Sequence, residues 1–309
     1  MQISKAQLIE KINDLDLEDS ELEQYLLEDD SKSEAFNVSY KVNPNNILNL
    51  SSADTFVLGY LNKRSRRIRR KRYNEKMENG FNGIQIVSEG DSWFQYPIFL
   101  EDVIDHLWEN DQFGIYSLGY GGDWLSNIFA EEEYLKAVRA IQPDIFLMSG
   151  GGNDLAGNNR VGTIVKTYLG SRPADDYLND EGEQFFREMK VLYKTIFDNV
   201  IAASPNTQII CHGYDYCIPR GQRWLGKPLA DRGITDESLQ ADIIHHLFDK
   251  FNDMQIELVS NYENVHHVDL RGTVIETSGW KDEIHPTSEY FGKIAEKIEA
   301  KILEVVNRS

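Results

Sequence analysis

From residue 82 onward the sequence alternates apolar segments with amphipathic ones, and this alternation most constrains the fold. The apolar segments lack strict polar alternation, as do strands of a parallel sheet covered on both faces. Helical periodicity separates them, which is typical of crossover connections. The pattern predicts an α/β fold, a three-layer α/β/α sandwich. Strands with their turns are expected at 83–90, 113–122, 143–154, 207–215 and 264–270, and helices at 98–110, 124–141, 181–203, 236–260 and 287–306.

The first 80 residues have a different character. Residues 1–35 carry eleven acidic and three basic side chains. Apolar residues at helical spacing predict two short amphipathic helices there, and Ser51 or Ser52 is expected to cap a further helix. We therefore expect a helical N-terminal region over 1–80, for partner binding or regulation, and the α/β domain over 81–309. The spaced apolar residues are Leu8, Ile12 and Leu15 for the first helix and Leu22, Leu26 and Leu27 for the second.

The expected third helix runs into the segment 63–72, in which eight of ten residues are basic. Such a run can grip the phosphates of nucleic acid or of an anionic membrane. The whole chain, however, carries 51 acidic against 32 basic residues, a net charge of −19, and so lacks a wider basic surface. A helix face that is solvated, or neutralised by the acidic segment before it, is the favoured interpretation.

Composition also bears on compartment and cofactors. With 41 % hydrophobic residues the chain can fill a substantial core. It has neither a run of about 18 apolar residues nor a basic, apolar leader, so we expect a globular cytoplasmic protein. The two cysteines, Cys211 and Cys217, form no metal-binding pattern. Reduced structural thiols are therefore expected, and neither a metal nor a cofactor is predicted.

Three glycine-rich turns follow successive strands at intervals of about 30 residues, the length of one βαβ unit. They carry Ser92, Gly122 and Asn153, and we expect them to meet, because the carboxyl ends of parallel strands share one sheet edge. Gly90 permits a tight turn that presents the Ser92 hydroxyl, as a nucleophile requires. The Ser92 and Gly122 N–H groups and the Asn153 amide can together hold an oxyanion. An ordinary turn serine is the alternative interpretation of Ser92.

A serine nucleophile needs a base, and Asp282 and His285 offer one. Because they lie three residues apart, they can meet across a single turn. The carboxylate then fixes the imidazole tautomer and stabilises its charged form. His285 is expected to take the Ser92 proton and return it to the leaving group. Pro286 suits the first position of the final helix.

At these residues the sequence resembles the SGNH (GDSL-like) serine hydrolases. Four short blocks match in order over residues 82–309: "GDSW", "GYGGDW", "GGGND" and "DEIHP". The resemblance implies a flavodoxin-like sheet and hydrolysis of carboxylic esters or thioesters through an acyl-enzyme, without a metal. Gly121 replaces Gly122 if the second block is aligned one residue earlier. The site residues that the resemblance implies are Ser92 as nucleophile, Asp282 and His285 as its partners, and Ser92, Gly122 and Asn153 as the oxyanion hole.

Two irregular segments, 155–180 and 214–234, follow the third and fourth strands and so overhang the same sheet edge. Loops in that place select substrates. Trp93 stands where the family often has leucine, which bears on the shape of the acyl pocket. Aromatic and cationic side chains in the second segment suit a sugar ring or an anionic acyl donor, or else pack the loop. The expected substrate-binding residues are Trp93, Tyr214, Arg220 and Trp224.

Other residues near these turns are expected to be structural. His212 is interpreted as a hydrogen-bonded core histidine, and Asp91 and Asp154 as stabilisers of their turns. The predicted function is hydrolysis of a small-molecule ester, such as an O-acetylated carbohydrate or a small acyl ester. A lysophospholipase and a thioesterase are alternatives within the family. A catalytically idle scaffold that binds partners through residues 1–80 is the alternative from another class.

Overall fold

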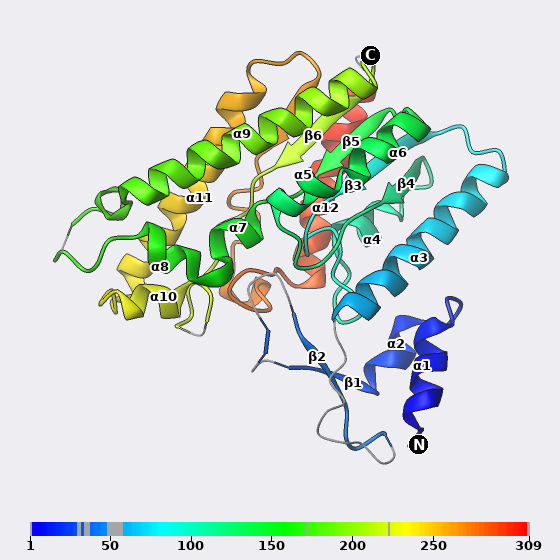
Figure 1. Ribbon diagram of the computed structural model, residues 1–309, viewed down its shortest axis with the longest axis horizontal. Coiled ribbons are helices and arrows are strands. Elements are labelled where there is room, and N and C mark those ends of the chain that lie inside the picture. Colours follow the sequence, from blue (N-terminus) through cyan, green and yellow to red (C-terminus); the bar gives the residue numbers. More distant parts are fainter. Residues whose placement is uncertain are drawn as a thin grey trace.

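The computed structural model describes residues 2–29, 32–33, 38–47, 58–170, 172–221 and 223–307 (Figure 1). Within these residues its centre is a five-stranded parallel sheet: β3 (Ile84–Glu89), β4 (Phe113–Ser117), β5 (Ile145–Met148), β6 (Gln208–His212) and β7 (Val265–Val268). Their order across the sheet is β4-β3-β5-β6-β7, with neighbours parallel throughout. Each strand lies in the segment expected for it, and the order is that of flavodoxin-like sheets.

Helices cover both faces of this sheet (Figure 1). One layer holds α4 (Val103–Leu107) and α12 (Ser288–Val306), which pack on each other. The other holds α5 (Leu125–Glu131), α6 (Glu133–Ile141), α9 (Asp180–Ala203) and α11 (Glu237–Val259). The sandwich predicted from the sequence is therefore confirmed. No helix in the described part of the chain is both long and apolar enough to cross a membrane.

Several helix ends differ from the sequence expectation. The helix before β4 is short, because it begins only after the capping residue Asp102. The helix before β5 is broken at Glu132, whose φ of 51° separates α5 from α6. The last helix begins at Ser288, so Pro286 precedes it and does not occupy its first position. Apolar periodicity locates a helix, whereas caps and single backbone angles set its ends.

The two segments expected to be irregular contain short helices. Residues 155–180 begin with the last two residues of α7 (Gly152–Ala156) and then include α8 (Arg160–Ile164) and a 3-10 turn, η2 (Ala174–Tyr177). Residues 214–234 include α10 (Gly226–Asp231). Helices this short have too few apolar repeats to be recognised from periodicity.

The N-terminal region contains a small sheet beside its helices. α1 (Lys5–Asn13) and α2 (Asp19–Glu23) are followed by β1 (Leu26–Glu28), which pairs antiparallel with β2 (Tyr40–Val42). Leu26 and Leu27, expected in a helix, lie in β1. Leu26 is buried and Leu27 exposed, the alternation of a strand, and so short a run fits either period. These elements share a second hydrophobic cluster, which Tyr96 also joins. The expected cap at Ser51 or Ser52 lies outside the described residues.

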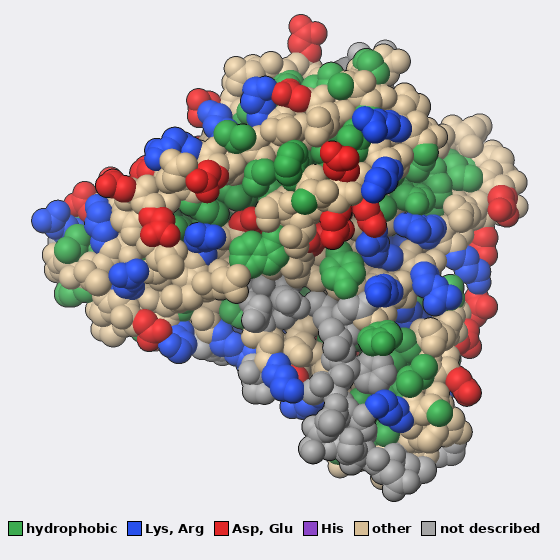
Figure 2. Space-filling view, in the orientation of Figure 1, with side chains coloured by type: hydrophobic (Ala, Val, Ile, Leu, Met, Phe, Trp, Pro, Cys, Tyr) green, Lys and Arg blue, Asp and Glu red, His purple; other side chains and the backbone are tan. Residues whose placement is uncertain are grey.

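Helix α3 (Leu58–Glu78) links this region to the sheet by packing along β4 (Figure 1). Figure 2 shows Lys and Arg side chains gathered over α3 with acidic side chains beside them. Most of the basic run is used inside the molecule. Its contacts are Arg64 with Asp19, Arg66 with Glu133, Arg69 with Asp102 and Asp105, Lys71 with Asp16, and Arg70 and Arg72 over the rings of Tyr116 and Trp108. The boundary after residue 80 and a partner for residues 1–80 stay predictions.

Candidate active site

Residues 90–95, here called the serine turn, directly follow β3. Two backbone N–H groups near the end of the turn donate to the Asp91 carbonyl at 3.0 and 2.9 Å, which closes it. A Cβ on Gly90 would lie 2.6 Å from the Ser149 carbonyl oxygen, so glycine allows the turn to approach the end of β5. Ser92, within this turn, is only 2 % exposed.

Ser92, His285 and Asp282 form a continuous hydrogen-bonded chain. The Ser92 Oγ lies 2.8 Å from His285 Nε2, and His285 Nδ1 lies 2.8 Å from Asp282 Oδ2. The other carboxylate oxygen, Oδ1, accepts the backbone N–H groups of Ile284 and His285 at 2.9 and 2.8 Å. With the carboxylate accepting from Nδ1–H, Nε2 is left to accept from the serine hydroxyl. This is the arrangement of a general base next to a nucleophile.

The surroundings keep Asp282 charged and His285 in place. Burial raises the pKa of Asp282, but the nearby His285 ring and the hydrogen bonds from the ring and two backbone N–H groups outweigh it, so the pKa lies below its ordinary value. His285 is 0 % exposed. The rings of Tyr96 and Trp224 stand edge-on to the imidazole, with centroids 5.0 and 6.5 Å away. The imidazole is therefore held from several sides.

Residues 119–123, here called the glycine turn, lie against the serine turn, because one of their N–H groups donates to the Gly90 carbonyl at 2.8 Å. Gly122 has a φ of 92°, which favours glycine. The Gly121 N–H donates to Asn62 Oδ1 at 3.0 Å and is therefore occupied. The Gly122 N–H has no hydrogen-bond partner in the part of the chain that the structure describes. Of the two alignments left open by the sequence, the geometry favours Gly122 as the candidate donor.

Asn153, in the first turn of α7, touches the glycine turn. Its Nδ2 donates to the Asp123 carbonyl at 2.6 Å, and an amide nitrogen carries a second hydrogen for another acceptor. The neighbouring Asp154 accepts the Leu125 N–H at 2.8 Å and so fixes the start of α5. Burial raises the pKa of Asp154 to about 6. The three turns expected to converge are thus linked by hydrogen bonds.

Asp91 stabilises the serine turn from inside. It accepts the Trp93 N–H at 3.1 Å and the Ser149 hydroxyl at 3.3 Å, and it also accepts from the Tyr214 hydroxyl. Trp93 and Tyr214 are both fully buried, and Trp93 donates from its indole nitrogen to the Ile284 carbonyl at 3.1 Å. The expectation that these two side chains contact substrate is therefore corrected. The turn directs the Trp93 side chain into the core, where it has no exposed surface for a substrate to contact.

Glu283 holds the loop 220–226, a role that the sequence analysis missed. Its buried carboxylate accepts five backbone N–H groups from the described residues of this loop, at 2.7 to 3.3 Å. The loop carries Arg220 and Trp224, two expected substrate-binding residues. The Arg220 guanidinium donates to the Thr277 and Trp280 carbonyls at 2.7 and 3.2 Å, so it is engaged in holding the 277–280 turn. An acid inside the "DEIHP" block was the available signal for Glu283.

A cavity of about 290 Å³ opens beside Asp282 and Trp224. Its walls combine aromatic faces with charged groups. Lys281 forms an ion pair with Glu28 of the N-terminal region, and its Nζ lies 4.8 Å from the Tyr96 ring. Both parts of the chain thus build this cavity. Its lining residues are Glu28, Ser33, Val38, Tyr96, Arg223, Trp224, Lys281 and Asp282.

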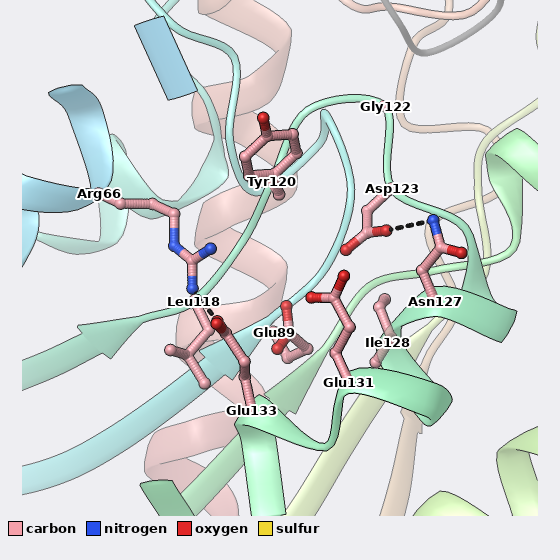
Figure 3. A pocket seen from close by; sticks show the side chains of 10 residues that line it. All are labelled: Arg66, Glu89, Leu118, Tyr120, Gly122, Asp123, Asn127, Ile128, Glu131 and Glu133. Atoms are coloured by element: carbon pink, nitrogen blue, oxygen red, sulfur yellow. Dashed lines mark hydrogen bonds and ion pairs between the residues drawn. The ribbon is translucent and has the colours of Figure 1, made fainter. Parts of the chain in front are cut away.

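A second cavity, of about 330 Å³, lies behind the glycine turn and is here called the acidic cavity. Figure 3 shows the Glu89 side chain pointing into it among other carboxylates, with Gly122 at its rim. Burial raises the pKa of Glu89 well above its ordinary value and that of Asp123 to about 6. Arg66 pairs with Glu133 at its edge. Among the described residues no three His, Cys, Asp or Glu side chains are arranged to hold a metal ion.

His212 and the two cysteines are core residues. The His212 Nδ1 lies 2.7 Å from the Gly213 carbonyl, and burial lowers its pKa to about 4, so it is neutral. Its ring stacks on Trp93 with centroids 5.9 Å apart. Cys211 and Cys217 are buried free thiols. All three side chains are therefore packed in the core.

Known proteins of similar sequence and fold were compared with this chain. A search of curated proteins gives no match. Solved structures of similar fold include a phospholipase A1 from Streptomyces albidoflavus (13 % identity, TM-score 0.51, 71 % of this chain and 100 % of that one) and an extracellular lipase from Streptomyces rimosus (14 %, 0.50, 71 % and 99 %). A family 3 carbohydrate esterase from Talaromyces cellulolyticus has 16 % identity and a TM-score of 0.45, over 73 % of this chain and 99 % of that one. The model of the GDSL-like lipase/acylhydrolase family matches residues 82–290, so this chain belongs to that family.

Proposed function

We propose that this chain hydrolyses short carboxylic esters of polar alcohols, such as O-acetylated carbohydrates, through an acyl-enzyme on Ser92. The observation that carries the proposal is the 2.8 Å contact between Ser92 Oγ and His285 Nε2, continued at 2.8 Å to Asp282. A hydroxyl in hydrogen-bond contact with an oriented imidazole is poised to lose its proton as it attacks.

The proposed reaction runs in two halves. Ser92 Oγ attacks the ester carbonyl carbon while His285 Nε2 takes its proton, and Asp282 stabilises the imidazolium. His285 then returns that proton to the departing alkoxide, which leaves as the alcohol. In the second half water attacks the acyl carbon, His285 takes a water proton, and the carboxylic acid leaves as Ser92 regains its hydrogen.

The negative oxygen formed in each half needs donors. We assign the Ser92 N–H, the Gly122 N–H and the second hydrogen of the Asn153 amide to this task. Each such donor contributes about 3 to 4 kcal/mol to stabilising the transition state. The Gly122 N–H, which no described residue accepts, and the contact of Asn153 with the glycine turn support this assignment.

The cavity beside Asp282 supports a small, polar substrate. At about 290 Å³ it is small, and its walls include Glu28, Arg223 and Lys281. A long acyl chain placed there would cover charged groups without replacing their hydrogen bonds, which is costly. A sugar ring offers hydroxyls for those groups and a face for Trp224.

The test is a chain-length series of p-nitrophenyl esters from acetate to palmitate, alongside an acetylated sugar and an acyl thioester. We expect turnover to be highest for acetate and to fall with chain length, and Ser92→Ala to abolish it without loss of folding. A preference for long chains would instead identify a lipase or lysophospholipase, and a preference for the thioester a thioesterase. A small fluorophosphonate should label Ser92, and absence of both labelling and turnover would identify an idle scaffold.

A further inference from the structure

Helix α3 reaches the glycine turn through one buried side chain. Asn62, which is 0 % exposed, bonds both polar groups of Gly121. Its Oδ1 accepts the Gly121 N–H at 3.0 Å, and its Nδ2 donates to the Gly121 carbonyl at 3.0 Å. These two groups belong to the peptide units on either side of the Gly121 Cα, so one side chain holds both units, whereas a single hydrogen bond would hold only one.

The second of these bonds controls the candidate oxyanion donor. The Gly121 carbonyl and the Gly122 N–H belong to the same planar peptide group. The described residues contain no cis peptide bond, so the N–H points opposite to the carbonyl. Because Asn62 holds the carbonyl toward α3, the Gly122 N–H is turned away from α3. Gly122 has a φ of 92° and no side chain, so the residue itself does little to prevent rotation of the peptide group between Gly121 and Gly122.

Helix α3 also forms hydrogen bonds with the serine turn. The Gln95 side-chain nitrogen donates to the Asn62 carbonyl at 3.3 Å, and its oxygen accepts from Arg69 Nη1 at 2.8 Å. Arg69 Nη1 further donates to the Phe94 carbonyl at 2.6 Å. Its Nη2 is paired with the buried Asp102 at 2.6 Å, which anchors the guanidinium. One face of α3 therefore connects both turns through a buried polar network.

We propose that Asn62 is a positioning residue that aims the Gly122 N–H at the substrate oxyanion, and that α3, although outside the matched residues 82–290, is part of the catalytic unit. The inference rests on the proposed function, which makes Gly122 an oxyanion donor. This inference gives the basic helix α3 a role within the molecule. The contacts of Asn62 and Arg69 anchor α3 to the two turns.

The first test is Asn62→Ala in the full chain, assayed with p-nitrophenyl acetate. Oxyanion donors act mainly in the transition state, so we expect kcat to fall at least about tenfold while KM changes little. The matched control is Arg72→Met on the same helix, whose side chain contacts Trp108 and neither turn. We expect this control to lower the unfolding temperature without lowering kcat. Equal losses of kcat in both variants would overturn the proposal.

The second test is Asn62→Asp followed over pH. As a carboxylate, the new side chain faces the Gly121 carbonyl with oxygen against oxygen. When protonated, it offers one acceptor and one O–H donor, the pair that the amide offers. We therefore expect the ratio of its kcat to that of the wild type to rise as pH falls from 8 to about 5. A ratio that does not change with pH would contradict the proposal, because a merely structural defect has no reason to be reversed by that proton.

A readout that does not depend on catalysis separates this inference from the proposed function. Amide hydrogen exchange of residues 119–124 should become faster in Asn62→Ala and stay as in the wild type in Arg72→Met. Faster exchange in a chain that hydrolyses no ester would support the positioning role and refute the proposed function. Unchanged exchange, or a wild-type kcat in Asn62→Ala, would overturn the inference while leaving the proposed function standing.

Discussion

Replacing Asp282 by asparagine separates the role of its charge from the role of its shape. In the structure, Oδ1 accepts two backbone N–H groups at 2.9 and 2.8 Å, and Oδ2 faces His285 Nδ1 at 2.8 Å. The amide oxygen of Asp282→Asn must take the Oδ1 place, since an NH₂ group there would oppose two donors. Its nitrogen then faces Nδ1 and donates to it. This forces the imidazole proton onto Nε2, which can no longer accept from Ser92.

The same change in the triad of a serine protease gives the wrong tautomer and lowers kcat by about 10⁴. At 1.36 kcal/mol per factor of ten, this corresponds to about 5.4 kcal/mol of barrier. The fold should suffer far less. We expect the unfolding free energy to fall by about 1 to 2 kcal/mol, because charge-assisted hydrogen bonds are replaced by neutral ones.

The assay is turnover of p-nitrophenyl acetate, with urea unfolding measured on the same samples. Asp144→Asn is the matched control, because its carboxylate also accepts a backbone N–H, that of Gln85 at 2.8 Å, but precedes β5 and so lies at the opposite sheet edge. We expect this control to keep wild-type kcat. An Asp282→Asn variant with kcat within tenfold of the wild type would refute the tautomer argument.

Three further predictions follow from buried groups. Burial raises the pKa of Cys211 to about 12 and that of Cys217 well above its ordinary value, so neither thiol should react with a disulfide reagent at pH 8 until the chain is unfolded. A fast-reacting thiol in the native protein would contradict this. Because the pKa of Asp154 is raised to about 6, the folded chain keeps that proton where the unfolded chain has lost it, and this carboxyl makes the unfolding free energy fall as pH rises from about 4 to about 6. In Asp154→Asn this part of the fall should be missing in urea titrations, and an identical slope would count against it. Arg69→Met should cost about 3 to 5 kcal/mol of unfolding free energy, since the buried Asp102 loses its partner, and a cost under 1 kcal/mol would be incompatible with that pair.

The sheet and the three converging turns could be predicted because their signals are local. The first four strands of the sheet are each followed within two residues by glycine, and parallel strands bring such ends to one edge. The Ser92 and His285 blocks were recognisable for the same reason. Which way a neighbouring side chain points is not local, however. Trp93 follows Ser92 directly, yet the turn sends it into the core, against Tyr214 and Phe291.

The contacts of α3 were out of reach for a different reason. A run of basic residues shows how much charge is present but not which residues neutralise it. Arg69 pairs with Asp102, 33 residues away, and Asn62 bonds Gly121, 59 residues away. No pattern in residues 58–78 distinguishes Asn62 from an exposed polar residue. Pairings at such separations depend on the completed fold.

The carboxylate of Glu283 holds its loop in a way that leaves the side chains of the loop free to vary. Because it binds main-chain N–H groups, it fixes the backbone of residues 220 and 223–226 without specifying their side chains. Trp224 and Arg223 could therefore be exchanged for other residues while the backbone keeps its path past the imidazole. Under the proposed function, such exchanges would change which ester is preferred while Glu283 still holds the loop beside His285.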